Sequence, residues 1–432
     1  MTPDPPVLTA VLSRIKTLYP KTIDLSLGRI ERLLDKLGSP HLKLPPVVHV
    51  AGTNGKGSVI AFMRSILEAS GYRVHAYTSP HLISFTERVR LCGHLIDPTV
   101  MADLLNHVAD INGDEPITFF EMITAAAYEA FAQTPADVLL LETGLGGRLD
   151  ATNVVPNPHA TVLTTIGMDH MSYLGDSLAS IAAEKAAIMK EGAPCICAEQ
   201  HADAAAIIEE VAEARNVSIR LQGRDWVIER DSLGAVRFAD AETKWSMPPP
   251  RLTGCHQTTN LGLALATLAM LPMSIPSFGL RSGMHQVEWP ARCQRINSGP
   301  LTQSLPTGWE VWLDGGHNPS AGKALATWIG SNPIPTVAIC GMMANKDCAG
   351  FLSPLVAYLS GLATVPIPGH DGCIDPDTLA ETARDAGFTT AVSADTVEDA
   401  LEVLKPHISH ARGRILICGS LYLAGEVLKT HI

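Results

Sequence analysis

Strand-like and helical stretches alternate along most of this chain, and this alternation limits the possible folds more than any other feature. Short apolar runs bounded by Gly or Pro recur at 45–52, 73–79, 137–144, 160–167 and 193–199, with helical patterns between them. Strands that alternate with helices form parallel sheets whose two faces are both covered by helices. The sequence therefore predicts an α/β protein.

The alternation starts again after a polar stretch rich in Gly, Pro and Ser, residues 297–308, which we interpret as a linker. Five further strand-like runs follow, the first of them EVWLDGG and the last RILICGS. A Gly-rich run with a single Lys, GTNGKGS at residues 52–58, directly follows the first expected strand. We therefore predict a P-loop NTPase-like domain with a parallel sheet over residues 1–296 and a smaller, Rossmann-like α/β domain over residues 297–432. The alternating stretch 226–240 predicts an antiparallel hairpin appended to the first domain.

Composition argues against several classes of protein. The formal net charge of the 432 residues is −12, which argues against non-specific binding to nucleic acid or to anionic membranes. No run approaches the roughly 18 apolar residues that a membrane-spanning helix needs, and the N-terminus lacks a signal-peptide pattern. The nine Cys residues include no CxxC pair, so we expect free thiols in a reducing, cytoplasmic compartment.

The stretch VAGTNGKGSV, residues 50–59, places three Gly residues around a single Lys, between an expected strand and an expected helix. In this position backbone N–H groups and a helix N-terminus can face an anion. Lys56 and Ser58 would add a charge and a hydroxyl group near phosphate and metal. The usual pattern is GxxxxGK[ST], whereas here Gly57 separates the Lys from the Ser. An ordinary strand–helix turn would not need three Gly residues. We therefore predict that residues 52–58, the phosphate loop, bind nucleotide phosphates.

Polar side chains stand where several expected strands end. They are Ser79 and His81 after one strand, Glu142 with Arg148 and Asp150 at another, and Asp169 and His170 after a third. Because the ligand site of a parallel sheet lies at the carboxyl ends of its strands, these side chains would converge near the phosphate loop. Taken singly, Ser79 with Pro80 could form a turn and His170 could cap a helix. Taken together, a carboxylate, an imidazole and a hydroxyl group beside bound phosphates suit Mg²⁺.

Seven motifs together resemble the dihydrofolate synthase/folylpolyglutamate synthase family, to which the Mur peptidoglycan ligases are related. In chain order they are HVAGTNGKGS, TSPHLISFTERVR, LETGLGGRLDATN, GMDHMSYLG, EKAAIMK, LTGCHQTTN and LDGGHNP. They appear in the order of that family and cover nearly the whole chain. The second and third motifs favour the folate branch over the Mur ligases.

The resemblance implies an ATP-dependent ligase that forms an amide bond. ATP would phosphorylate a carboxylate on a pterin substrate, and the amine of L-glutamate would attack the acyl phosphate and release phosphate. The expected small-molecule substrates are ATP, L-glutamate, dihydropteroate and folates, and the expected cofactor is Mg²⁺. We expect a monomer with no nucleic-acid or membrane partner, acting on dihydropteroate and, by polyglutamation, on folates.

Carried over position by position, the resemblance assigns the nucleotide and metal contacts. The ATP contacts are Gly55, Lys56, Gly57, Ser58, Asn260, Arg292 and Asp314, with His317 as a further candidate near the nucleotide. The metal ligands are Ser79, Glu142, His170 and Lys185, and the catalytic residues are Lys56, Glu142, His170 and Lys185. Composition alone would make Lys185 a solvated helix residue, but the family carries this Lys as a carbamate, an anion that helps to hold a second Mg²⁺.

The resemblance assigns the pterin site to three stretches. They are Thr22, Ile23, Asp24 and Leu25; Thr118, Phe119, Phe120 and Glu121; and Leu149, Asp150 and Ala151. Phe119 or Phe120 could pack on a pterin ring, with Asp150 near its polar edge. For either Phe, a place in the core is an equally good interpretation.

Two positions depart from the family pattern. Ala291 stands where Gly is common, directly before Arg292, and could alter a hinge or simply be tolerated there. Asn345 stands where an acidic residue is common. Neither change removes a proposed ligand.

Two other functions remain open at this point. A Mur-type ligase acting on a UDP-muramoyl peptide would be expected to carry a further N-terminal domain, whereas the first expected strand begins at residue 45. A P-loop protein that binds ATP without ligation would not need so many candidate metal ligands or a second α/β domain.

Overall fold

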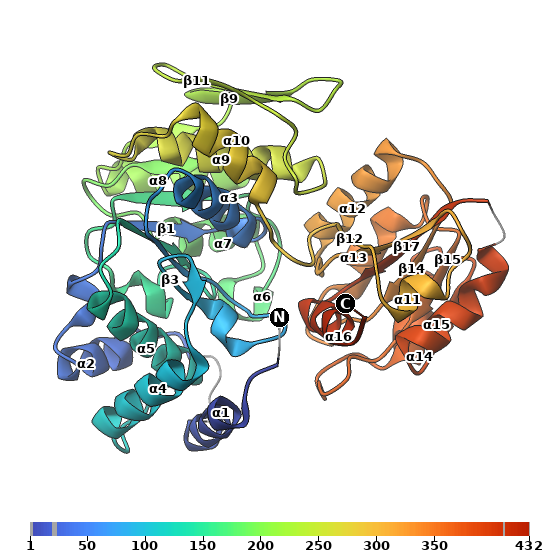
Figure 1. Ribbon diagram of the computed structural model, residues 1–432, viewed down its shortest axis with the longest axis horizontal. Helices are drawn as coiled ribbons and strands as arrows, with labels where there is room; N and C mark the ends of the chain where they lie inside the picture. Colours follow the sequence, from blue (N-terminus) through green and yellow to red (C-terminus); the bar gives the residue numbers. More distant parts are fainter. Residues whose placement is uncertain (1–2, 20–23, 409–410, 432) are drawn as a thin grey trace.

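The structure is a computed structural model that describes residues 3–19, 24–408 and 411–431. Two α/β domains lie side by side, the first on the left of Figure 1 and the second on the right. Each is built on a largely parallel sheet, and a separate three-stranded sheet lies at one end of the first domain. This architecture confirms the predicted fold class.

An eight-stranded sheet with the order β4-β3-β2-β5-β1-β6-β7-β8 forms the centre of the first domain. Its strands are β1 Val47–Ala51, β2 Val74–Tyr77, β3 Val89–Leu91, β4 His94–Leu95, β5 Val138–Glu142, β6 Ala160–Leu163, β7 Cys195–Cys197 and β8 Ile219–Leu221. All neighbours from β2 to β8 pair parallel, while β3 and β4 pair antiparallel at one edge. β1 and β5 are buried along their whole length, which explains their continuous apolar sequences.

Helices cover both faces of this sheet. They are α1 Pro6–Leu18, α2 Gly28–Lys36, α3 Lys56–Ala69, α4 Pro98–Asn112, α5 Phe119–Gln133, α6 Met171–Leu174, α7 Leu178–Ala186, α8 Ala202–Ala214, α9 His256–Met270 and α10 Ser277–Gln286. Successive strand side chains point to opposite faces. Val48 and Leu140 therefore join a core with α3, α9 and α10, whereas Val47 and Leu141 join a core with α1, α2, α4 and α5.

The separate antiparallel sheet consists of β9 Trp226–Arg230, β10 Val236–Asp240 and β11 Lys244–Met247. β9 and β10 form the hairpin predicted over residues 226–240, and β11 adds a third strand that the sequence pattern did not indicate. Trp226 packs closely on Gly262 of α9, which attaches this sheet to the first domain (Figure 1).

The second domain contains a six-stranded sheet with the order β12-β13-β17-β14-β15-β16, parallel except for β12. Its strands are β12 Gln294–Ile296, β13 Trp309–Leu313, β14 Thr336–Cys340, β15 Gly361–Thr364, β16 Ala391–Ser393 and β17 Gly413–Cys418. Its helices are α11 Pro300–Gln303, α12 Pro319–Ser331, α13 Cys348–Leu352, α14 Pro376–Asp385, α15 Val397–Leu404 and α16 Leu421–His431. Val337 of β14 joins a core with α15 and α16, and Ala338 joins one with α12, α13 and α14, so helices again cover both faces.

The stretch 297–308 lies within the second domain rather than between the domains. β12 pairs with β13 in the second sheet, and the stretch that connects these two strands contains α11. The chain instead crosses between the domains at 287–293, after α10 and before β12. A composition rich in Gly, Pro and Ser is common to surface connections of every kind, so it could not separate a strand connection from an interdomain linker.

All nine Cys residues are free thiols, as the sequence predicts. Among the residues that the structure describes, every helix is too short or too polar to cross a lipid bilayer.

The carboxyl ends of strands from both sheets border the gap between the domains. β1, β5 and β6 lead into the phosphate loop, Glu142 and Asp169, while β13, β14 and β17 lead into Asp314, Lys346 and Ser420. All of these residues line the two cavities described below. Ligand sites of open parallel sheets form at this end of the strands, and here two such ends face each other.

Candidate active site

The loop between β1 and α3 is shaped to hold an anion. Gly52 and Gly55 have φ of 149° and 94°, and a side chain at either position would overlap Thr164 or Asn260. α3 begins at Lys56, so the free N–H groups of its first turn border the loop. Lys56 Nζ donates a hydrogen bond to the carbonyl of Gly52 at 3.1 Å, which holds its positive charge over the loop.

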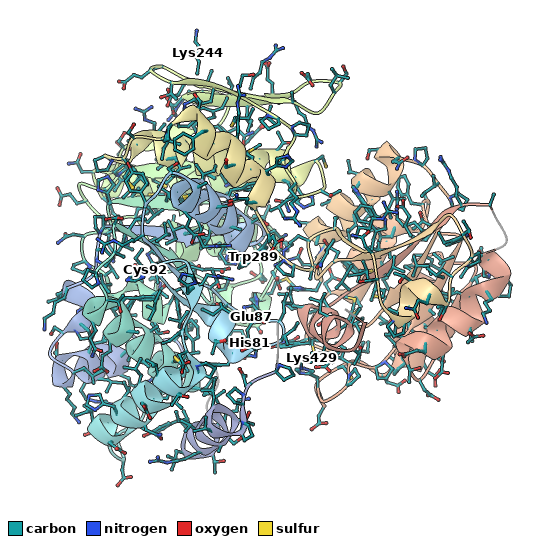
Figure 2. All side chains as sticks on the ribbon, in the orientation of Figure 1. His81, Glu87, Cys92, Lys244, Trp289 and Lys429 are labelled. Atoms are coloured by element: carbon teal, nitrogen blue, oxygen red, sulfur yellow. The ribbon has the colours of Figure 1, made fainter. Side chains whose placement is uncertain are left out.

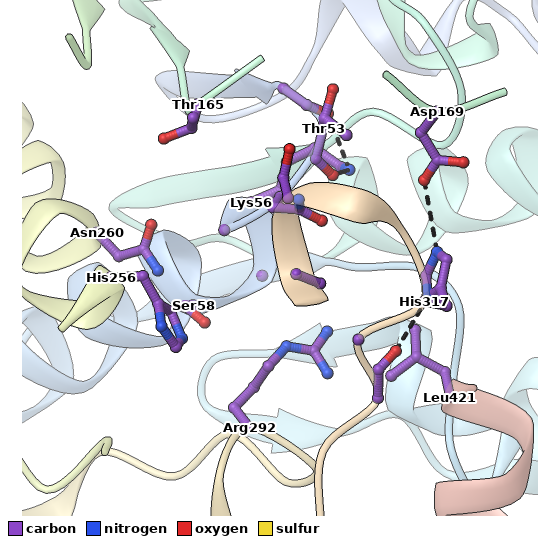
Figure 3. Close-up of a pocket in the computed structure, with 18 of the residues that line it drawn as sticks. Thr53, Lys56, Ser58, Thr165, Asp169, His256, Asn260, Arg292, His317 and Leu421 are labelled. Carbon is purple, nitrogen blue, oxygen red and sulfur yellow. Dashed lines mark hydrogen bonds and ion pairs between the residues drawn. The ribbon is translucent and has the colours of Figure 1, made fainter. Parts of the chain in front are cut away.

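A cavity of about 290 Å³ adjoins this loop and is lined by residues of both domains. The residues predicted to contact ATP all line it: Gly55, Lys56, Gly57, Ser58, Asn260, Arg292, Asp314 and His317. Figure 3 shows Lys56 and Asn260 on the side of the first domain, with Arg292 and His317 reaching the cavity from the side of the second domain. The tertiary structure thus joins residues that are far apart in the sequence into one cavity wall.

Ser79, Glu142 and His170, three of the predicted metal ligands, line the same cavity. Glu142 is buried, and its Oε2 accepts a hydrogen bond from the backbone N–H of Ser79 at 3.2 Å while Oε1 lies 3.9 Å from Lys56 Nζ. Burial raises the pKa of Glu142, and the positive charge of Lys56 opposes that rise. Burial lowers the pKa of His170 to about 4, so its imidazole is neutral at pH 7 and able to bind a metal.

These three residues suit an ion that takes few protein ligands. In the described part of the chain, no group of three or more His, Cys, Asp and Glu side chains could hold a metal by itself. A carboxylate, a neutral imidazole and a hydroxyl group are donors for Mg²⁺, which completes its coordination with phosphate oxygens and water. The residues present therefore fit a complex of a divalent metal with a nucleotide better than a metal bound by protein alone.

Lys185, the fourth predicted ligand, is buried although composition alone suggested a solvated residue. Its neighbours Ala182 and Ala186 belong to the core beneath β6 and β7, and this packing carries the Lys side chain inward. Its Nζ donates a hydrogen bond to the carbonyl of Gly52 at 3.1 Å, next to the phosphate loop. Burial and the nearby charge of Lys56 lower the pKa of Lys185 to about 7.

Asp169 connects the first domain to the second. Its Oδ1 lies 2.6 Å from Lys346 Nζ, and its Oδ2 lies 3.5 Å from His317 Nε2. Burial alone would raise the pKa of Asp169, but the hydrogen bond from His317 and the surrounding positive charges hold it well below its usual range. Asn318 donates a hydrogen bond to Asp169 at 3.0 Å and exchanges two more with Asn54 of the phosphate loop, so the second domain contacts that loop directly.

A second cavity, of about 410 Å³, adjoins the first. The two cavities share the lining residues Ser79, Pro80, Gly144, Leu145, His170, His317 and Leu421. Of the residues predicted for the pterin site, those that line the second cavity are Asp24, Leu25, Thr118, Phe120, Glu121, Leu149, Asp150 and Ala151. Thr22 and Ile23, also predicted for this site, lie outside the described residues.

The two Phe residues at the start of α5 point in different directions. Phe120 lines the second cavity, and its ring centroid lies 6.3 Å from that of Tyr77. Phe119 does not line it and packs instead 6.4 Å from the ring of Phe85, with the amino group of Lys16 at 5.6 Å from its own ring. Successive helix residues point about 100° apart, and here Phe120 and Glu121 face the cavity while Phe119 points toward Phe85.

The acidic residues of the second cavity are held by local hydrogen bonds. Asp150 accepts hydrogen bonds from the backbone N–H groups of Leu145 at 2.7 Å and Thr152 at 3.0 Å, and burial raises its pKa. Glu121 Oε2 accepts hydrogen bonds from Thr118 and Arg29. Its Oε1 is buried and has no hydrogen-bond partner in the described structure.

Several lining residues of the second cavity were missed by the sequence reasoning. They are Arg88, Asn345, Lys346, Ser420 and Tyr422. Arg88 donates its Nε–H to Nδ1 of His81 at 2.9 Å, and burial together with the charge of Arg88 lowers the pKa of His81 to about 3. Lys346 and Ser420 follow β14 and β17, so the strand-end argument that located Glu142 could have found them in the second domain as well.

Comparisons with known proteins agree with this arrangement. The family pattern of the Mur ligase middle domain matches residues 50–268, and that of the dihydrofolate synthetase C-terminal domain matches residues 300–430. The dihydrofolate synthase/folylpolyglutamate synthase of Escherichia coli is 32% identical over 98% of this chain and 95% of its own length. The match to a folate-specific C-terminal domain distinguishes this chain from Mur ligases that act on UDP-muramoyl peptides.

Two solved structures have the same fold over nearly the whole chain. The structure of E. coli FolC in complex with DHPP and ADP has a TM-score of 0.87 and 31% identity, covering 98% of this chain and 97% of its own. A bifunctional folylpolyglutamate synthase/dihydrofolate synthase with Mn, AMPPNP and L-glutamate bound has a TM-score of 0.85 and 28% identity, covering 98% of this chain and 97% of its own.

Proposed function

Because this chain belongs to the dihydrofolate synthase/folylpolyglutamate synthase family of ATP-dependent ligases, we propose that it joins L-glutamate to dihydropteroate and also to folates. The substrate carboxylate attacks the γ-phosphorus of ATP and displaces ADP, which forms an acyl phosphate. The glutamate amine then attacks the acyl carbon, an amide bond forms, and phosphate and a proton are released. Phosphorylation precedes amide formation because phosphate is a far better leaving group than the oxide of a free carboxylate.

The observation that carries this proposal is the junction of the two cavities. The first cavity contains the phosphate loop, the second contains the stretches expected to bind a pterin, and they share Ser79, His170 and His317. A terminal phosphate held by the loop would meet, at this junction, a carboxylate that enters from the second cavity. Holding the reacting groups together in this way supplies a large part of the rate enhancement of such enzymes.

We assign nucleotide binding to the first cavity. The N–H groups at the start of α3 and the amino group of Lys56 would bind the phosphates, because a helix N-terminus and a Lys side chain both stabilise negative charge there. Asn260 and Arg292 would contact the remainder of the nucleotide, and Asp314 would orient the wall that the second domain provides. The assignment is supported by their place in one cavity with the loop.

We assign Mg²⁺ to Ser79, Glu142 and His170. When bound, the ion would offset the negative charge of the phosphates during phosphoryl transfer. Glu142 and His170 are suited to this role because one is a buried carboxylate and the other a neutral imidazole in the same cavity. A relative that holds Mn together with AMPPNP supports a divalent ion at the nucleotide, and Mg²⁺ is the ion to test first.

Lys185 is proposed to act as a carbamate. A neutral amine can add to CO₂ with formation of an N–C bond and loss of a proton, and the pKa of Lys185, about 7, leaves much of this amine neutral at physiological pH. The product is an anion at the wall of the first cavity, where the resemblance places a second Mg²⁺. Conversion of the buried cation to an anion would also relieve its repulsion with Lys56.

The second cavity is proposed to hold the pterin substrate and glutamate. Phe120 offers a ring surface to a flat pterin, and Glu121 beside it adds an acidic side chain to the cavity wall. Arg88 of the first domain and Lys346 of the second also line this cavity and supply the positive charges that the two carboxylates of glutamate require. This division places each substrate against side chains of complementary chemistry.

Contacts between the domains would protect the acyl phosphate from water. Asn318 bonds to Asn54 of the phosphate loop, and Lys346 pairs with Asp169, so the second domain covers the junction of the cavities. Excluding water from a reactive intermediate prevents its hydrolysis.

We further propose that the protein is a monomer and that it acts in the cytoplasm. Its nine free thiols suit a reducing compartment such as the cytoplasm. Analytical ultracentrifugation would test the monomeric state, and cell fractionation would test the location.

The test of the function measures phosphate release from ATP in the presence of Mg²⁺ and L-glutamate. Dihydropteroate, tetrahydrofolate and a UDP-muramoyl acceptor are added in turn. We expect release that requires both glutamate and a pterin acceptor, with mass spectrometry showing the added glutamate. Release only with the muramoyl acceptor would indicate a Mur-type ligase, and release without any acceptor would indicate an ATPase. Replacing Mg²⁺ with Mn²⁺ or Ca²⁺ in the same assay tests the identity of the metal.

A further inference from the structure

Gly57 is the third Gly of the phosphate loop, and its backbone conformation does not require glycine. Gly52 and Gly55 have positive φ, whereas Gly57 does not and lies in the first turn of α3. Within a helix Gly is less favourable than Ala, because it loses more backbone freedom on folding. Two features can account for a Gly at such a position: a contact from elsewhere in the protein, or the close approach of a bound ligand.

Such a contact comes from Trp289. A Cβ atom at Gly57 would lie 2.4 Å from Cζ2 of Trp289, 2.7 Å from Cε2 and 2.8 Å from Nε1. Carbon atoms in van der Waals contact are about 3.5–4.0 Å apart, so the indole edge occupies the space that a side chain would need. Trp289 is half-buried and packs against the core of α3, α9 and α10. Figure 2 shows Trp289 where the first domain faces the second.

Trp289 belongs to the segment that crosses between the domains, and the far end of this segment is tied to the second domain. The N–H of Cys293 donates a hydrogen bond to Oδ2 of Asp314 at 2.8 Å, and the N–H of Gly315 donates one to the carbonyl of Ala291 at 2.9 Å. Ala291 and Cys293 have φ of 56° and 41°, so the backbone turns here through left-handed conformations. The crossing segment is thus held at both of its ends.

We propose that Trp289 is a positioning residue for ATP binding: by resting on Gly57, it sets where Arg292 and the second domain stand relative to the phosphate loop. Arg292 follows Trp289 by three positions and lines the first cavity. Displacing the indole would move Arg292 and Asp314 with the crossing segment and weaken their contacts with the nucleotide. This inference rests on the proposed function in one respect, that ATP occupies the first cavity.

A third cavity allows this proposal to be tested without unfolding the protein. It has a volume of about 320 Å³ and borders Gly57, Trp289 and Arg292. Because there is free space beside the indole, a methyl group at position 57 can push Trp289 aside while the core remains packed. Gly57→Ala is therefore expected to fold with a displaced indole.

The experiment uses the full-length protein with four variants: Gly57→Ala, Trp289→Leu, the double variant, and Gly28→Ala. Gly28 is a matched control because it also lies in the first turn of a helix and a Cβ there would meet nothing within 4 Å. Affinity for AMPPNP with Mg²⁺ is measured by calorimetry, KM and kcat for ATP by phosphate release, and the melting temperature by calorimetric scanning.

We expect Gly57→Ala to weaken AMPPNP binding at least tenfold and to raise the KM for ATP more than it lowers kcat. Because Gly57 also lines the first cavity, the same change in the Trp289→Leu background should still weaken binding, but by a clearly smaller factor, and Gly28→Ala should leave the affinity unchanged. An equal loss in both backgrounds would overturn the proposal, because the nucleotide itself would then require Gly at position 57.

The melting temperatures give an answer that does not depend on nucleotide. Gly57→Ala should lower the melting temperature of the wild-type protein and raise it in the Trp289→Leu background, where only the better helix propensity of Ala remains. The same shift in both backgrounds would overturn the packing relationship. Failure of the wild-type protein to bind AMPPNP would instead count against the proposed function, so the two failures are distinguishable.

Discussion

The amino group of Lys346 lies 2.6 Å from Oδ1 of Asp169, and this ion pair connects the two domains where the cavities meet. The side chains are only 12% and 8% exposed, so the charges are largely removed from water. Asp169 follows β6 in the first sheet and Lys346 follows β14 in the second. The pair therefore forms only when the carboxyl ends of the two sheets face each other.

Removing the charge of Lys346 should impair the reaction. Breaking a buried ion pair from one side costs about 3 kcal/mol or more of conformational stability, which here would fall on the arrangement that brings the two domains together. A hundredfold lower population of that arrangement corresponds to about 2.7 kcal/mol, so we expect Lys346→Met to lower kcat/KM on that order in the glutamate-dependent assay. The matched control is Lys323→Met, a charge loss at an exposed position of α12. Activity equal to that of the control would show that the ion pair does not support catalysis.

The two Phe residues of α5 should respond differently to truncation. Phe120→Leu removes an aromatic surface from the second cavity, and such contacts contribute about 0.5–1.5 kcal/mol, so the KM for dihydropteroate should rise roughly two- to tenfold. Phe119→Leu changes a ring that packs on Phe85 outside the cavity and should leave that KM unchanged. Steady-state kinetics measures the KM for dihydropteroate of each variant. Equal effects from the two variants would contradict the assignment of Phe120 to the pterin site.

Loss of Lys185 should abolish most activity, and small carboxylic acids should restore part of it. Lys185→Ala removes the proposed carbamate, so we expect turnover to fall by about two orders of magnitude, in line with the loss of a metal-site group. Acetate or formate, which can supply a carboxylate to the vacated space, should restore part of it. Lys190→Ala is the control, since Lys190 bonds to the carbonyl of Asn153 and does not line the first cavity. Normal turnover in Lys185→Ala would remove Lys185 from the mechanism.

His49 should make the fold less stable in acid. It is fully buried on β1 with Nε2 2.8 Å from Thr152 Oγ1, and burial lowers its pKa to about 3. An unfolded His gains a proton below about pH 6.5 while the folded one does not until about pH 3. Stability present above pH 6.5 is therefore lost as the pH falls, by about 2 kcal/mol at pH 5. Urea unfolding at pH 8 and pH 5 should show a smaller loss for His49→Gln than for the wild type, and equal losses would argue against this role.

The sequence predicted the parallel sheet of the first domain and the place of the Gly-rich loop between β1 and α3 well, because both depend on local patterns. A buried parallel strand is a continuous apolar run, and a strand, a Gly-rich turn and a helix define a phosphate loop within a short stretch. The strand-end rule then brought Ser79, Glu142 and His170 to the same place, and all three line the first cavity. Lys185 lay beyond such patterns and was named only through the family resemblance.

Other features could not be predicted because they depend on packing between distant segments. The packing of α5 on the sheet determines that Phe120, and not Phe119, faces the second cavity. The polar stretch 297–308 has the composition of a linker, yet the pairing of β12 with β13 places it inside the second domain. No local pattern carries information about either relationship.

By itself, the sequence determined that this chain forms two α/β units with a phosphate loop, since hydrophobic periodicity and Gly placement act over a few residues. Only the tertiary structure decided that Trp289 covers Gly57 and that Lys346 meets Asp169. The physical reason is that both contacts join residues more than 170 positions apart, with 177 positions between Lys346 and Asp169. The first depends on how the segment after α10 packs on α3, and the second on how the two domains pack together, and no short stretch of sequence encodes either.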